Sequence, residues 1–345
     1  MLSITKVCKK YKLVLFAVSC FLVISCGKNL PEEKILAGRA LGTTYQIKYF
    51  SENDLNLKSG VDSIFQAINK SMSTYSPDSD ISKINKGDSL LVVDDMFVEV
   101  FKTSKIIFEK SDGYFDPTVG NLVNFYGFGP DKFTLKIDSA NIDSLMQYVG
   151  FDKVKLTPNH TIRKSDTAVY IDFNAIAKGF SVDRLAAYLQ QNGVENYLVE
   201  VGGELVAHGK NLSNHDAWKV GIDDPKQTSG KRTLATVIEL KNHGMATSGN
   251  YRKFRVDSAT GEKYMHTINP LTGYPARNSV LSASVLAKNC MLADGYATTF
   301  MALGLEKSKE LLKTLPDIDA YLIYAEKDSI GTFMTEGFKR QLVEG

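Results

Sequence analysis

Residues 168–193 read Ala-Val-Tyr-Ile-Asp-Phe-Asn-Ala-Ile-Ala-Lys-Gly-Phe-Ser-Val-Asp-Arg-Leu-Ala-Ala-Tyr-Leu-Gln-Gln-Asn-Gly. The first part, Ala168–Phe173, is rich in β-branched and aromatic residues and predicts a strand. The second part, Ala175–Gln191, has the periodicity of a helix and ends just before Gly193, a typical helix terminator. The chain is therefore expected to change from strand to helix near Asn174.

Strands and helices are interleaved along the rest of the chain but do not strictly alternate. This order favours an α+β fold with mixed or antiparallel sheets and flanking helices over a doubly wound nucleotide-binding fold. The glycine-rich phosphate loops of such folds are also absent from the sequence. Further strands are expected at Thr43–Phe50, Asn196–Val201, Trp218–Ile222, Leu234–Leu240, Val280–Ala287 and Ala320–Ala325, further helices at Val61–Met72, Asp95–Lys110 and Met291–Leu303, and a hairpin at Tyr251–Ile268.

Composition excludes several classes of protein. Of the 345 residues, 43% are hydrophobic and 23% are charged, which excludes a collagenous, coiled-coil or disordered chain. The formal net charge is +2, but four lysines lie in the first 25 residues, and the remainder holds 37 basic and 39 acidic residues. Because there is no basic excess, we expect no nucleic-acid partner.

The N-terminus has the organisation of a secretory signal. A basic segment, Lys6–Lys12, precedes an apolar stretch, Leu13–Ser25, that is too short to span a bilayer. The tetrapeptide Val-Ile-Ser-Cys that ends at Cys26 resembles a bacterial lipobox, in which the cysteine is acylated. A plain signal peptide with a chance cysteine is the alternative. We predict a signal peptide over residues 1–25, a tether over 26–36 that follows a lipidated Cys26, and one folded domain over 37–345.

Two groups of residues could bind a metal ion or a phosphate. Asp294 and Thr298 are four residues apart on a predicted helix, so both project from one face, and hard oxygen ligands suit Mg²⁺. The alternative is structural: Asp294 would compensate the helix dipole, and the hydroxyl group of Thr298 would donate to the backbone carbonyl four residues earlier. In Asp172–Gly179, Asn174 could cap the helix while Lys178 and the free N–H groups bind an anion. An ordinary capped helix with a surface lysine is the alternative.

Three loops could complete a site. The aromatic residues among the glycines of Gly113–Gly129 could form a slot for a planar ring or a packed core loop. The paired glycines of Glu200–Glu204 allow a ligand to approach the backbone, or simply make a turn. His266 lies among polar residues on a predicted loop, where it could act as a base or bind phosphate, or be structural.

Together these segments resemble the ApbE family of FAD:protein FMN transferases. The resemblance implies a two-lobed catalytic domain related to the T-fold. It extends in order through Gly42–Tyr45, Met72–Asn85, Gly113–Gly129, Asp172–Asp183, Glu200–Glu204, Ala246–Tyr251, His266–Pro275 and Ala293–Gly304.

The resemblance also implies the roles of individual residues. Mg²⁺ would be held by the backbone carbonyl of Ala177 and the side chains of Asp294 and Thr298, and His266 would lie near the reacting phosphate, with Asp294 and His266 as the catalytic residues. FAD would contact Leu41, Tyr75, Tyr114, Phe115, Asp116, Asn174, Lys178 and His266. Three residues depart from the family pattern, Leu41 for Met and both Asn250 and Asn269 for Asp. The two asparagines each remove a negative charge.

The implied reaction is the Mg²⁺-dependent transfer of FMN from FAD to a threonine hydroxyl of a flavoprotein, with release of AMP. An FAD pyrophosphatase and a non-catalytic flavin-binding lipoprotein are the alternatives. The implied protein partners are flavoprotein subunits such as those of Na⁺-translocating NADH:quinone oxidoreductase or Rnf-type complexes. The implied location is the periplasmic side of a bacterial membrane, the inner rather than the outer, through the lipid anchor.

Overall fold

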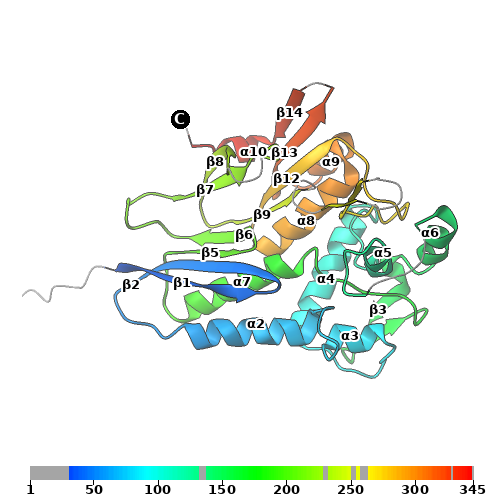
Figure 1. Cartoon of the computed structure of the whole chain (residues 1–345). Helices are drawn as coiled ribbons and strands as arrows, with labels where there is room; N and C mark the ends of the chain where they lie inside the picture. Colours follow the sequence, from blue (N-terminus) through cyan, green and yellow to red (C-terminus); the bar gives the residue numbers. More distant parts are fainter. Residues whose placement is uncertain are drawn as a thin grey trace, which may run out of the picture.

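A computed structural model describes residues 31–131, 137–227, 232–249, 254–256, 263–327 and 329–343. Its centre is an eight-stranded sheet in which every pair of neighbours is antiparallel (Figure 1). This confirms the α+β prediction. The strand order is β1 (Glu32–Ala40), β2 (Thr43–Ser51), β5 (Tyr197–Val201), β6 (Glu204–His208), β9 (Gly244–Gly249), β12 (Val280–Ala287), β13 (Asp319–Glu326) and β14 (Ser329–Met334).

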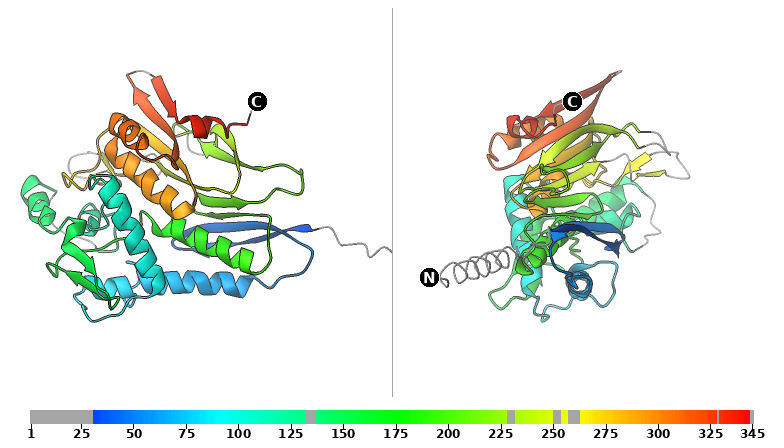
Figure 2. Two further views of the ribbon diagram at one scale, coloured as in Figure 1. Left: turned by 180° about the vertical axis from the view of Figure 1, so that it is seen from behind. Right: turned by 90° about the vertical axis from the view of Figure 1, so that its left-hand side faces the viewer.

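Four long helices lie on one side of the sheet: α2 (Lys58–Met72), α4 (Asp95–Lys110), α7 (Ala177–Gln191) and α8 (Cys290–Leu303), as the view from behind shows (Figure 2). Helices α7 and α8 pack directly on the strands, α2 packs on α7, and α4 contacts α2 and α8. The remaining elements are α3 (Asp80–Asn85), α5 (Gly120–Phe125), α6 (Ser139–Met146), a 3-10 turn (Phe151–Lys153), β3 (Val154–Leu156), β4 (Ile162–Lys164), β7 (Trp218–Asp223), β8 (Leu234–Leu240), β10 (Phe254–Val256), β11 (Lys263–Met265), α9 (Leu305–Leu312) and α10 (Glu336–Lys339).

Both faces of the sheet are covered by apolar side chains. On the helical face, Val199 and Val201 of β5 pack in one cluster with Leu185 and Leu189 of α7. On the other face, the β7–β8 hairpin contributes Trp218 and its neighbours to a cluster with Phe338 of α10 and with strand residues. Burial of apolar surface on two sides holds the sheet between these layers.

Helices α7 and α8 cross at very short range. An added Cβ at Gly179 of α7 would lie 2.3 Å from the carbonyl oxygen of Cys290, so only glycine fits there. The carboxylate of Asp183, one turn further along α7, accepts hydrogen bonds from the backbone N–H groups of Cys290 and Met291, both at 2.8 Å. These bonds satisfy donors that a helix N-terminus leaves free, and they fix the start of α8 against α7.

The prediction of a strand over Ala168–Phe173 is wrong. The apolar side chains of Val169, Ile171 and Phe173 are buried, as in a strand packed on a core, but Asp172 is buried as well. The backbone, however, finds partners other than a neighbouring strand. The side-chain amide of Asn85 donates to the carbonyl of Ile171 and its oxygen accepts from the N–H of Ile171, both at 2.8 Å. Tyr170 makes one isolated bridge to Val119.

Helix α7 begins later than predicted. It starts at Ala177, and Ile176 occupies the N-cap without a side-chain hydrogen bond, so the prediction that Asn174 caps the helix is wrong. The carboxamide of Asn174 instead donates to Asp172, at 3.0 Å. Its place beside that carboxylate keeps it outside the helix.

The remaining predicted elements are confirmed to within a few residues at each end. The predicted hairpin contains the antiparallel pair β10–β11, while its turn lies outside the described residues. The prediction of a tether over 26–36 needs correction, because Glu32–Ala40 form β1 and pair with β2. The signal, Cys26 and Asn250 also lie outside the described residues. Within the described ranges, no helix combines the length and apolarity that a membrane span requires.

The close crossing makes a prediction about Gly179. Gly179→Ala should lower the free energy of unfolding by about 1–3 kcal/mol, because the new methyl group meets backbone atoms that cannot move without shifting α8. Urea denaturation followed by circular dichroism measures this. Gly60→Ala is the matched control: its Cβ would meet only the end of the Tyr188 side chain, which can rotate away. Equal stability of the two variants would contradict the close packing.

Candidate active site at the crossing of helices α7 and α8

Charged side chains meet where α7 begins. Asp294 of α8 is buried, and its Oδ2 accepts a hydrogen bond from the N–H of Gly179 at 2.9 Å. Lys178 forms an ion pair with Oε1 of Glu204, the first residue of β6, and its Nζ lies 3.8 Å from Oδ1 of Asp294. One ammonium group therefore lies between two buried carboxylates.

The environment shifts the protonation of these groups in definite directions. Burial is the largest influence on Asp294 and raises its pKa, although the nearby Lys178 lowers it. Burial also opposes the charge of Lys178, but the carboxylates of Asp294 and Glu204 outweigh it, so the pKa of Lys178 lies above its ordinary value. Lys178 is thus a permanent cation at this site.

The three residues expected to bind a metal ion lie on the two helices that cross. Ala177 begins α7, two residues before the Gly179 that contacts Asp294 of α8. Thr298 follows one turn after Asp294, partly exposed on a helix that is otherwise mostly buried. The hydroxyl group of Thr298 lies 3.3 Å from that of Ser248 on β9. The described residues contain no group of three or more His, Cys, Asp or Glu side chains that could hold a metal ion. One carboxylate with neutral oxygen atoms fits Mg²⁺, which keeps waters and phosphate oxygens as its other ligands.

A second cluster gathers residues from three distant parts of the sequence. The hydroxyl group of Tyr75, which follows α2, donates to the carbonyl of Phe128 at 3.1 Å. The ring of Phe128 meets that of His266 edge to face, with centroids 6.3 Å apart. Asn174 lies 3.5 Å from the hydroxyl group of Thr74, the neighbour of Tyr75. Asn174 is four residues before Lys178, so the chain connects this cluster directly to the charged one.

The aromatic segment 113–129 mainly packs inside the protein. Phe115, Leu122, Phe125 and Tyr126 are buried, which supports the core-loop alternative over an open slot. Among the residues expected to contact FAD here, only Tyr114 presents its side chain at the surface, where Lys307 contacts its hydroxyl group and ring.

Asp116 supports the same loop from inside. One carboxylate oxygen accepts from the N–H and hydroxyl groups of Thr118, and the other accepts from the N–H of Phe151 at 3.0 Å. Burial raises the pKa of Asp116 to about 6 in spite of these bonds. Asp116 thus links the segment of Thr118 to that of Phe151 through hydrogen bonds.

Leu41 occupies the tight turn between β1 and β2. It has a φ of 49° and the following Gly42 a φ of 73°, the left-handed pair that a two-residue hairpin turn requires. A leucine rarely adopts this conformation, and backbone strain of this kind often occurs at functional sites. Its side chain packs against two apolar clusters.

The departure at Asn269 has a local explanation. Its side-chain oxygen accepts from the N–H of Leu271 at 2.9 Å and so closes the turn that follows His266. An aspartate could make the same bond, so the turn itself does not require the negative charge.

Sequence reasoning missed several residues that complete the site. Glu204 lay in a segment considered only for its glycines, and Ser248 lay in a segment to which no role was assigned. Phe128 and Asp172 join predicted residues to one another. The sequence contains one signal for Glu204. It is an acidic residue next to apolar residues that form a strand, and such a residue needs a partner when it is buried.

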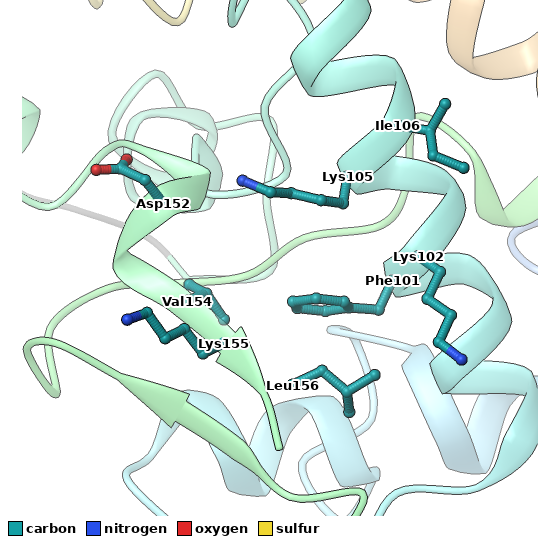
Figure 3. A pocket seen from close by; sticks show the side chains of 8 residues that line it. All are labelled: Phe101, Lys102, Lys105, Ile106, Asp152, Val154, Lys155 and Leu156. Atoms are coloured by element: carbon teal, nitrogen blue, oxygen red, sulfur yellow. The ribbon is translucent and has the colours of Figure 1, made fainter. Parts of the chain in front are cut away.

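A cavity of about 890 Å³ lies elsewhere, between α4 and β3 (Figure 3). Its walls contain no residue of the predicted site. It is lined by Phe101, Lys102, Lys105, Ile106, Asp152, Val154, Lys155 and Leu156.

Comparison with known proteins identifies the family of this chain. Residues 41–322 match the sequence pattern of the ApbE family. The chain belongs to the ApbE family. A relative from Haemophilus influenzae named FAD:protein FMN transferase is 34% identical, over 95% of this chain and 98% of its own. A relative of the same name from Vibrio cholerae is 33% identical, over 92% of this chain and 96% of its own.

Solved ApbE structures have the same fold. The flavin transferase ApbE from Vibrio cholerae superposes with a TM-score of 0.81 at 33% identity, covering 90% of this chain and all of that one. The flavinyl transferase ApbE from Pseudomonas stutzeri gives a TM-score of 0.80 at 30% identity, covering 92% and 98%. The family resemblance and the fold predicted from sequence are thereby confirmed.

Proposed function

We propose that this protein is an FAD:protein FMN transferase, which moves FMN from FAD to a threonine hydroxyl of a target flavoprotein and releases AMP. The observation that supports the proposal is the contact of the buried Asp294 with the start of α7, at Lys178 and Gly179, with Thr298 one turn further along α8. The relatives named FAD:protein FMN transferase, which align over nearly the whole chain, support the same conclusion.

Asp294 and Thr298, with the backbone of Ala177, would hold Mg²⁺. When bound, the ion would neutralise the pyrophosphate and the charge that develops on departing AMP. Lys178 adds a fixed positive charge next to this position, which favours binding of the phosphates. The free N–H groups expected at the start of α7 are not available for the same anion, because the N–H of Ala177 donates to the carbonyl of Phe173 and that of Gly179 donates to Asp294.

The proposed transfer step is a direct displacement at phosphorus. The hydroxyl oxygen of the target threonine attacks the phosphorus on the FMN side of FAD, and the bond from that phosphorus to the oxygen of AMP breaks. His266 is our candidate for accepting the hydroxyl proton, since it lies in the cluster with Tyr75 and Phe128. The product is a phosphoester between FMN and the target, and no covalent enzyme intermediate is needed.

Aromatic side chains are available to cover the flavin. Tyr75 is 60% exposed although its hydroxyl group is anchored to Phe128, and Tyr114 lies at the surface beside Lys307. Exposed rings held in place by a hydrogen bond or a cation suit stacking on a planar ligand. Such a cover would also keep bulk water away from the reacting phosphorus.

The target and location rest on the family resemblance and the N-terminal sequence. We infer that the target is a flavoprotein subunit of a membrane redox complex of the Na⁺-translocating NADH:quinone oxidoreductase or Rnf type. We also infer that a lipidated Cys26 attaches the protein to the periplasmic side of the inner membrane.

A first prediction tests the reaction and its metal. With FAD, Mg²⁺ and a flavoprotein target, the protein should release about one AMP per protein-bound FMN, measured by nucleotide chromatography and in-gel flavin fluorescence. Asp294→Ala should lower the rate at least about 100-fold, because the metal supplies several kcal/mol of stabilisation. Asp317→Ala, at an exposed position, is the control and should keep full activity. AMP release without protein-bound FMN would replace the transferase by a pyrophosphatase.

A second prediction separates the role of Tyr75, which would cover the flavin, from that of His266, which would accept the proton. Tyr75→Ala should weaken FAD binding and raise the share of FAD that is hydrolysed, because water then reaches the phosphorus. His266→Ala should reduce transfer about 100-fold or more while FAD affinity stays close to the wild-type value. FAD titration by fluorescence and the ratio of bound FMN to AMP measure both effects. If His266→Ala lost FAD binding instead, its role would be in binding.

A third prediction concerns the anchor. Cys26→Ser should move the protein from the membrane fraction to the soluble fraction, because acyl chains bind through about 0.8 kcal/mol per buried CH₂ group. Flavin transfer by the released protein should be retained. Fractionation followed by immunoblotting measures this, and an unchanged membrane fraction would reject the lipid anchor.

A further inference from the structure

Glu204 is a buried carboxylate at the centre of the site whose contacts are unusually few. Only 3% of its surface is exposed, its Oε1 pairs with Lys178, and its Oε2 has no hydrogen-bond partner among the described residues. A buried charge is costly unless it is paired, so its ion pair with Lys178 is the contact that keeps it there.

The backbone holds Glu204 rigidly in this place. It follows the turn of Gly202 and Gly203, whose φ angles of 65° and 104° suit glycine. The N–H of Gly203 donates to Oε1 of Glu200 at 2.6 Å, and an added Cβ at Gly202 would lie 2.8 Å from Thr43. The backbone of Glu204 is therefore fixed, and the flexible Lys178 side chain extends to its carboxylate to form the ion pair.

Lys178 and a divalent cation would compete for the same oxygen atom. Oδ2 of Asp294 is bonded to Gly179, so Oδ1 is the oxygen left for a cation, and it lies 3.8 Å from Nζ of Lys178. A full Lys178–Asp294 hydrogen bond would occupy Oδ1. The closer contact of Lys178 with Glu204 prevents this.

We propose that Glu204 is a positioning residue that holds Lys178 away from Oδ1 of Asp294 and so keeps this oxygen available to the divalent cation. The inference rests on the proposed function, which places the cation at Asp294 and Thr298. Without the Glu204 carboxylate, Lys178 turns to Asp294 as its remaining buried partner and blocks the site.

Mn²⁺ binding to the full chain without FAD tests the proposal, with free Mn²⁺ followed by electron paramagnetic resonance. Glu204→Gln should weaken Mn²⁺ affinity about tenfold, equivalent to about 1.4 kcal/mol. In a Lys178→Met background, Glu204→Gln should change the affinity less than twofold, because the competing ammonium is gone. Asp317→Asn removes a negative charge at an exposed position outside the site, and should leave the affinity of the otherwise wild-type protein within twofold.

The outcomes separate this inference from the function on which it rests. If the wild-type protein bound no Mn²⁺, the proposed metal site itself would be wrong. If the wild type bound and Glu204→Gln bound equally well, Glu204 would have no positioning role. An equal loss in the Lys178→Met background would show Glu204 to act directly on the cation and would overturn the proposal. Thermal melting of each variant verifies that the fold is retained.

Discussion

The contact between Gly179 and the start of α8 is the constraint on which the site depends. The missing side chain lets two helices approach until the backbone N–H of one reaches the carboxylate of the other, and Asp183 locks the same crossing through two further N–H groups. Ala177 and Lys178 on one helix and Asp294 and Thr298 on the other are thereby held in fixed relation. Preorganisation of this kind spares the enzyme the cost of assembling charged groups during the reaction.

Elements with strong periodicity could be predicted from the sequence. Helix α4 was found with its observed ends, and the β-branched and aromatic content of β2, β5, β12 and β13 predicted these strands of the central sheet, whereas β1, β6, β9 and β14 were not predicted. The failures have physical reasons. The segment Ala168–Phe173 has the β-branched and aromatic content of a strand, but the side chain of Asn85, 86 residues away from Ile171, takes the place of a strand partner. A single sequence carries no sign of such a long-range contact.

Helix spacing places Asp294 and Thr298 on one face, but it was the family resemblance that made them candidate metal ligands. The link between His266 and Tyr75 requires the fold, because it runs through Phe128, which lies in a third segment. Phe115 and Asp116 were expected to contact FAD, because they lie in a glycine-rich loop with aromatic residues. In the structure the side chains of Phe115 and Asp116 are buried and support the loop that carries Tyr114.

The pairing of Asn85 with Ile171 has an implication for inherited variation in this enzyme. Asn85 ends a short helix, carries no charge and belongs to none of the reacting groups, yet both of its amide bonds hold the segment that leads into Asn174 and Lys178. A substitution there would leave two backbone groups of a buried residue without partners, each costing about 1–3 kcal/mol. Natural variants could thus lose catalytic competence through a side chain that a survey of the active site alone would pass over.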